Sequence, residues 1–234
     1  MKEKDTNLQE IRDMSVLLFN TVPIEADEVL GMFVQHPFIG SIVDYDMENQ
    51  MMLDLRKKED LQKCREIWIK RIQESDLLRI YMFVRTPYKM TWFKYCNEFM
   101  REEDYGKYLE DCWVSQENPN QDVNVSRKES VSLFKKANKK YLMTEEDYEY
   151  FNNLPEEIEI WRGVSPGREE YGLSWTDDYE KAVWFKERFE RDGVEGYLLH
   201  AKINKRDVLA YFNSRSESEL VVDVFKIKKS IERL

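Results

Sequence analysis

Cysteine and histidine are scarce in this chain of 234 residues, and their scarcity narrows what the protein can be. The three cysteines, Cys64, Cys96 and Cys112, form no paired CxxC spacing, and the chain has only two histidines. Structural zinc sites draw their ligands from clusters of these residues. We therefore expect no metal site, and free thiols in a reducing compartment.

Glycine is also scarce, and its eight residues are unevenly spread. Only three of them lie in residues 1–155, whereas the other five fall between Gly163 and Gly196. Helices dominate where glycine is rare, and strands joined by turns need it. This contrast predicts a mostly helical region over 1–155 and a second domain over 156–234.

Long apolar runs and an excess of positive charge are both missing. No run approaches the ~20 apolar residues that a membrane-spanning helix needs, and no apolar stretch follows the basic residues near Met1. The net charge of −10 argues against a nucleic-acid partner, because phosphate binding needs a basic surface. We expect a cytoplasmic protein with no signal peptide and no membrane partner.

The apolar residues that are present follow helical spacing through the first region. This spacing predicts helices over 59–78, 89–100 and 102–113. A loop is expected over 115–122 from its polar composition. Ser126 opens the next helix, with Glu129 completing a capping box. Thr144 opens another helix, which ends before Pro155 because proline disfavours helix in the residue before it.

The pattern changes to strands in the second region. We expect a helix over 177–191, opened by a capping box of Asp177 and Glu180, with Val183, Trp184, Phe185 and Phe189 as its apolar stripe. Strands are expected over 158–164, 196–203, 208–212, 220–224 and 225–231. One helix among several strands indicates an α+β domain with a twisted sheet, against which the helical region packs.

Three short segments of this region carry polar side chains that could do chemistry. Segment 160–163 reads Ile-Trp-Arg-Gly, segment 172–176 reads Gly-Leu-Ser-Trp-Thr, and segment 217–219 reads Glu-Ser-Glu. Alternation along an extended chain would place Glu217 and Glu219 on one face. Each segment alone is also typical of a surface arginine, a helix cap or a pair of solvated acids.

In this order, the three segments resemble the arginine–serine–glutamate class of mono-ADP-ribosyltransferases. The resemblance covers residues 158–234, and residues 118–155 look like a segment of bacterial and phage proteins of this type. It implies a toxin-like, twisted β-sandwich with a cleft for NAD, which is the substrate, and no metal. It further implies a target protein as acceptor, and leaves action inside a host bacterial cell open.

The resemblance also implies a role for each matching residue. Arg162 would contact the phosphate and ribose region of NAD, and Gly163 would let the backbone bond the nicotinamide carboxamide. Ser174 would orient the catalytic carboxylate of Glu219. Glu219 would bond the ribose 2′-hydroxyl and stabilise the oxocarbenium-like transition state. Glu217 would align an arginine acceptor.

The remaining residues have two interpretations each, of equal weight only for Thr176. Thr176 either caps the following helix or supports the cofactor. Phe185 and Phe212, together with Tyr171, are candidates for stacking on nicotinamide, although aromatic residues at such spacing also build cores. Arg215 lies in a turn that would meet the acceptor, where it is either a substrate contact or a solvated side chain.

Three functions stay open from the sequence. The first is transfer of ADP-ribose from NAD to a protein, with arginine as the expected acceptor. The second keeps the chemistry but uses water, a nucleic acid or a small molecule as acceptor. The third is a non-catalytic protein that binds NAD or a partner.

Overall fold

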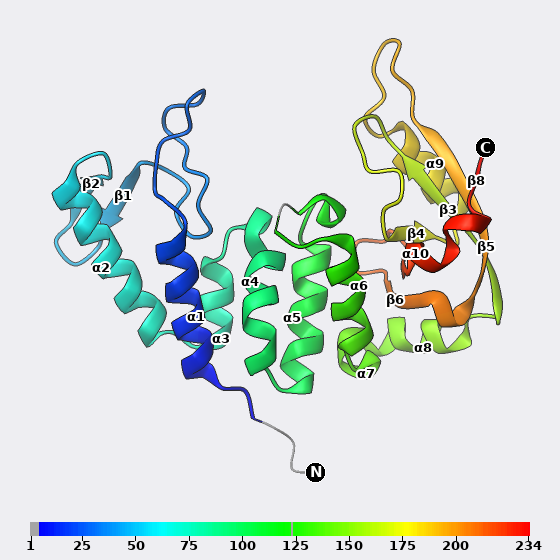
Figure 1. The fold of residues 1–234 in the computed structure, drawn as a ribbon, viewed down its shortest axis with the longest axis horizontal. Helices are drawn as coiled ribbons and strands as arrows, with labels where there is room; N and C mark the ends of the chain where they lie inside the picture. The colour runs from blue at the N-terminus through cyan, green and yellow to red at the C-terminus, as the bar shows by residue number, and fades with distance from the viewer. Residues whose placement is uncertain (1–4, 123) are drawn as a thin grey trace. The chain divides into compact units, whose positions relative to one another are not determined.

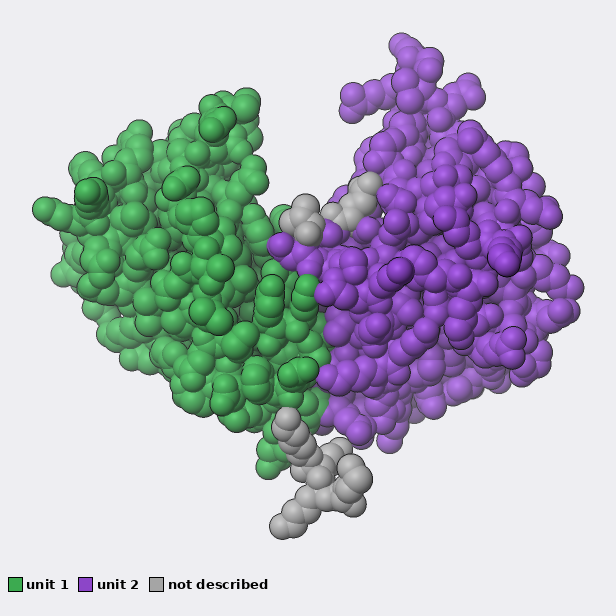
Figure 2. Space-filling view, in the orientation of Figure 1, with its two compact units in different colours: residues 1–101 green, residues 102–234 purple. Residues whose placement is uncertain are grey.

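The structure, a computed structural model, describes residues 5–122 and 124–234. Figure 2 colours its two compact units, which divide between Arg101 and Glu102. The boundary predicted at residue 155 falls inside the second unit, where helices give way to a sheet. Among the described residues, no helix combines the length and apolar character that crossing a membrane requires.

The first unit consists of helices and one hairpin. Its elements are α1 (Leu8–Thr21), β1 (Val43–Asp46), β2 (Met51–Asp54), α2 (Lys58–Glu74), α3 (Leu77–Phe83) and α4 (Lys89–Cys96), with 3₁₀ turns at Thr86–Tyr88 and Asn97–Phe99. The sequence did not indicate the antiparallel β1–β2 hairpin. The helix predicted over 59–78 is instead α2 and α3. Asp76 separates them, because its carboxylate accepts from the Arg79 amide at 2.8 Å and caps a new helix.

The core of the first unit contains three residues of the scarce types, His36, Cys64 and Cys96. His36 is buried, and its ring accepts hydrogen bonds from the amides of Phe38 and Ile39. Burial lowers the pKa of His36 to about 4, so the ring is neutral near pH 7 and serves the fold. The three cysteines are not joined in disulfides, as the sequence predicted, and all of them are buried.

The second unit begins with four helices, and side-chain caps mark the starts of the last three. These are α5 (Glu102–Val114), α6 (Arg127–Lys136), α7 (Lys139–Leu142) and α8 (Glu145–Asn153), with a 3₁₀ turn at Pro119–Gln121. The predicted capping box is confirmed, since Ser126 and Glu129 each accept from the other's amide. Thr144 caps α8 by accepting from the Asp147 amide, and α8 ends before Pro155, as predicted.

A six-stranded antiparallel sheet follows, in the order β6-β7-β4-β3-β5-β8. Figure 1 labels its strands other than β7. Its strands are β3 (Glu157–Val164), β4 (Ser174–Thr176), β5 (Tyr197–Asn204), β6 (Val208–Phe212), β7 (Glu219–Val222) and β8 (Glu232–Arg233). The α+β class is therefore confirmed. The strands form one hydrogen-bonded sheet, although its halves meet at a single pair, Trp161 opposite Thr176.

The structure differs from the prediction at the end of the chain. The strand predicted over 225–231 is wrong: α10 (Val224–Ile227) and a 3₁₀ turn (Lys228–Ser230) lie there. Val224 and Ile227 are buried while Phe225 is 44% exposed, which is helical rather than strand spacing.

The helix predicted over 177–191 is shorter, and it buries a different face. It is α9 (Tyr179–Glu187), and its cap is Asp178, which accepts from the Lys181 amide. Asp177 instead accepts from the Tyr150 hydroxyl at 2.7 Å. Ala182 is the buried residue of α9, whereas Trp184 of the predicted stripe is 51% exposed.

Candidate functional site

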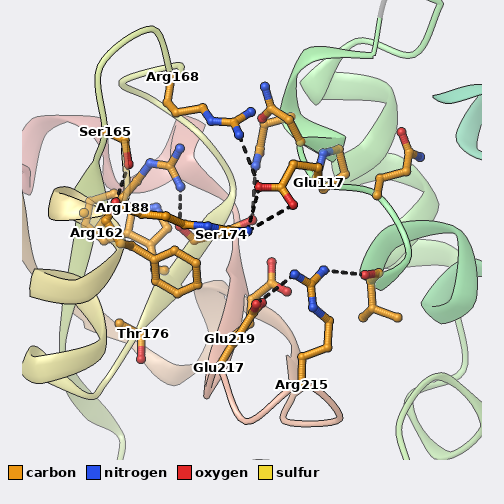
Figure 3. A pocket seen from close by; sticks show the side chains of 18 of the residues that line it. Glu117, Arg162, Ser165, Arg168, Ser174, Thr176, Arg188, Arg215, Glu217 and Glu219 are labelled. Carbon is orange, nitrogen blue, oxygen red and sulfur yellow. Dashed lines mark hydrogen bonds and ion pairs between the residues drawn. The ribbon is translucent and has the colours of Figure 1, made fainter. Parts of the chain in front are cut away.

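A pocket in the second unit is lined by residues from all three polar segments (Figure 3). The sheet brings them together, because β4 lies between β3 and β7. Thr176 of β4 pairs with Trp161 of β3 on one side and with Glu219 of β7 on the other. Arg162, Ser174 and Glu219, which are far apart in the sequence, therefore come from three neighbouring strands.

Glu219 is the carboxylate that this pocket holds most firmly. Its Oε1 accepts from Nε1 of the buried Trp113 at 2.8 Å. Burial raises the pKa of Glu219, and hydrogen bonds from Ser174 and Trp113 oppose that rise. The charge of Glu217 raises the pKa further, and that of Arg162 lowers it. The result is a fixed, largely desolvated carboxylate whose ionised form depends on its hydrogen-bond donors.

The contact between Trp113 and Glu219 gives a prediction that does not depend on any activity. Trp113→Phe keeps the aromatic packing on Phe134, whose ring centroid is 5.1 Å away, but removes the N–H donor. A hydrogen bond to a charged group contributes roughly 1.5–3 kcal/mol, so its loss disfavours the ionised form. We expect the pKa of Glu219 to rise further, seen as a shift of its carboxyl titration to higher pH.

Carboxyl ¹³C NMR of glutamate-labelled protein measures this titration, and Glu219→Gln assigns the signal. Trp92→Phe is a matched control, because it removes another buried indole hydrogen bond, to Ser15 in the first unit. The control should leave the Glu219 titration unchanged. An unchanged titration in Trp113→Phe would contradict the electrostatic role of the indole.

Arg162 builds the wall of the pocket in this structure. Its guanidinium donates to the carbonyl oxygens of Ser174 at 2.6 Å, Glu169 at 2.8 Å and Glu170 at 3.3 Å. The side chain is buried, and burial lowers its pKa to about 10. These bonds fix the segment leading into β4, so Arg162 shapes the pocket. Its contact with a phosphate stays a prediction.

Gly163 allows α9 to pack directly on β3. A Cβ atom at this position would lie 2.1 Å from the carbonyl oxygen of Ala182 and 2.4 Å from the amide nitrogen of Lys186. No side chain fits there without displacing the helix. The close approach matters for the site, because Phe185 and Arg188 at the end of α9 line the same pocket as Gly163.

The remaining predicted residues separate into those inside the pocket and those outside it. Thr176 lines the pocket and its hydroxyl also accepts from the Asp178 amide at 3.1 Å, so it supports the start of α9. Phe185 lines the pocket as well. Phe212 is not brought there: it is 2% exposed and packs in the core, 6.2 Å from the Phe134 ring. Tyr171 also lies elsewhere, with its ring 4.3 Å from the Lys228 ammonium.

The segment that follows α5 forms a wall that the sequence did not indicate. Asn120 accepts from the Leu173 amide at 2.6 Å and donates to the Ser174 hydroxyl at 3.1 Å. Glu117 forms ion pairs with Arg188 at 3.1 Å and Arg168 at 3.3 Å. Polar composition predicted only a loop here. The resemblance that begins at residue 118 was the one signal that this stretch belongs with the sheet.

Charged side chains of both signs line the pocket. Four arginines line it within a chain of net charge −10, and they face three glutamates: Arg162, Arg168, Arg188, Arg215, Glu117, Glu217 and Glu219. Guanidinium groups match phosphate oxygens in geometry and charge. Together with the aromatic ring of Phe185, they suit a ligand that combines phosphates with a flat ring.

Comparisons of the chain with protein-family models, with curated proteins and with solved structures find no match. In the described ranges, no group of three or more His, Cys, Asp or Glu side chains could hold a metal ion. The pocket and the three segments that converge there are the features of the chain that bear on its function.

Proposed function

We propose that this chain is an NAD-dependent mono-ADP-ribosyltransferase, which transfers ADP-ribose to a protein acceptor and releases nicotinamide. Arginine is the expected acceptor residue. The observation that carries the proposal is the convergence of Arg162, Ser174 and Glu219 on one pocket. Each pattern is common and weak alone, and the meeting of all three at one pocket supports the proposal.

Glu219 would act at the bond between nicotinamide and ribose. As this carbon–nitrogen bond breaks, the electron pair leaves with nicotinamide and positive charge develops on the ribose carbon. A fixed carboxylate close to that carbon stabilises the charge without having to reorganise. The donors that hold Glu219, Trp113 at 2.8 Å and the Ser174 hydroxyl, supply this preorganisation.

Two of the arginines that line the pocket, Arg168 and Arg188, would bind the diphosphate of NAD. Arg168 and Arg188 both form ion pairs with the carboxylate of Glu117, which shows that the two guanidinium groups can bind one anionic group together. The phosphates would compete with Glu117 for the same guanidinium groups. Phe185, which also lines the pocket, would offer its ring to the nicotinamide.

The test is incubation of the purified chain with NAD labelled in the adenylate moiety, with and without cell lysate. The proposal expects a labelled protein band that is lost in Glu219→Ala. Free ADP-ribose formed at the same rate with and without lysate would indicate hydrolysis instead. NAD binding in calorimetry without nicotinamide release would indicate a non-catalytic protein. A folded chain that neither binds nor cleaves NAD would contradict the proposal.

A further inference from the structure

The turn between β6 and β7 places an arginine of this chain beside its own glutamate pair. Ser216 and Ser218 both have positive φ, at 56° and 48°, which is rare for residues other than glycine. Asn213 holds this shape, because its carbonyl oxygen accepts from the Ser216 amide and its side chain accepts from the Ser218 amide. The turn therefore fixes where Arg215 and Glu217 lie.

Arg215 reaches into the pocket with its guanidinium bound at two points. Nη2 lies 2.9 Å from Oε1 of Glu217, and Nη1 donates to the Val114 carbonyl at 2.8 Å. In Figure 3 the guanidinium points toward the carboxylates of Glu217 and Glu219. The side chain of Arg215 remains 40% exposed. The group that Glu217 binds in this structure is thus a guanidinium.

From this arrangement we propose that Arg215 is itself an acceptor, so that the protein attaches ADP-ribose to its own Arg215. This inference rests on the proposed function, and it names the acceptor group and the residue. An acceptor held inside the pocket needs no encounter with a partner, and holding the reacting groups in place lowers the entropic cost of the reaction.

The chemistry balances with groups that the pocket and NAD supply. The bond from the ribose carbon to nicotinamide breaks, and neutral nicotinamide leaves with the electron pair. A guanidine nitrogen of Arg215 forms the new bond to that carbon. Guanidinium groups are protonated in proteins, so this nitrogen must lose one proton. Glu217, at 2.9 Å, lies within the range that a general base requires and accepts it.

The other arginines that line the pocket are engaged differently. Arg162 is buried and donates to three backbone carbonyls. Arg168 and Arg188 pair with Glu117. Neither set forms an ion pair with Glu217 among the described residues, whereas Arg215 does. The inference therefore predicts one modified site rather than several.

The experiment incubates the purified full chain with NAD alone and follows intact mass, peptide masses and nicotinamide release. We expect one ADP-ribosyl group per chain, located on Arg215, with a first-order rate constant that does not change when the protein is diluted. Arg215→Lys keeps a cation opposite Glu217 but removes the guanidinium. It should abolish the adduct. Arg206→Lys, which replaces an exposed arginine before β6, should leave it intact.

The outcomes separate this inference from the proposed function. Nicotinamide release without an adduct on Arg215 would overturn the inference and leave the proposed function standing. An adduct that persists in Arg215→Lys, or whose rate constant per chain rises with protein concentration, would overturn it as well. A folded wild-type chain that releases no nicotinamide would contradict both.

Discussion

Glu219→Gln is expected to lower the rate of nicotinamide release by about 10²–10³, the usual cost of losing one preorganised charge-stabilising group. Gln keeps the size of the side chain, and its Oε1 can still accept from Trp113 Nε1. It cannot offset the positive charge that develops on the ribose carbon. NAD affinity should change little, because this charge exists only in the transition state.

The same substitution should also make the fold more stable at neutral pH. Burial raises the pKa of Glu219 above its value in the unfolded chain, so the folded chain binds this proton more tightly. Stability therefore falls as pH rises through the folded-state pKa, and Gln removes that loss. Below the pKa of the unfolded carboxyl group the two proteins should unfold alike.

Single-turnover nicotinamide release and thermal unfolding at several pH values check both effects. Glu159→Gln, which changes an exposed acid on β3, is the matched control and should alter neither. A folded Glu219→Gln protein that releases nicotinamide at the wild-type rate would remove Glu219 from the mechanism. A less stable one at neutral pH would show that its carboxylate is not destabilised by burial.

Glu217→Gln is expected to reduce ADP-ribosyl transfer by about 10² while nicotinamide release continues, because general-base catalysis typically contributes about 10²–10⁴. Glu217 binds a guanidinium through Oε1 in the structure, and it lies in the turn rather than in β7. Its carboxylate would take the proton of the acceptor, a step that follows loss of nicotinamide. Gln can still orient a guanidinium but accepts no proton.

Both readouts can be taken from one reaction, as adenylate label on protein and as free nicotinamide. Free ADP-ribose should appear in place of the missing protein label, because water then captures the ribose carbon. Glu159→Gln again provides the control for a surface acid. Equal loss of transfer and of nicotinamide release would contradict the division of labour between the two glutamates.

Local chemistry made part of the fold predictable. The box of Ser126 and Glu129 and the cap at Thr144 depend on residues three apart, so the sequence determines them directly. The predicted start of α9 was wrong by one residue, because Asp177 and Asp178 are adjacent and either side chain can cap a helix. A tertiary contact distinguishes the two residues. The Tyr150 hydroxyl donates a hydrogen bond to the Asp177 carboxylate, and Asp178 caps the helix.

The site was predictable where it follows strands and not where it depends on packing between distant segments. Arg162, Ser174 and Glu219 belong to short patterns within strands, and the sheet brings them together. Phe212 has the same local setting as a pocket aromatic, yet packing against Phe134 keeps it in the core. Nothing local marks Trp113, because its partner Glu219 is 106 residues away.

The helices of the second unit are part of the site. Trp113 at the end of α5 holds Glu219, and Val114 holds Arg215. Asn120 bonds β4 through Ser174. The unit that contains the pocket therefore begins at Glu102 rather than at residue 156. Trp113 and Val114 lie outside the resemblance, yet they supply a donor to Glu219 and an acceptor to Arg215.

The most direct test of the central claim is nicotinamide release from NAD by the purified full chain, measured without lysate. The account predicts release that depends on Glu219 and requires no added metal. A folded chain that leaves NAD intact, with or without candidate acceptors, would contradict it.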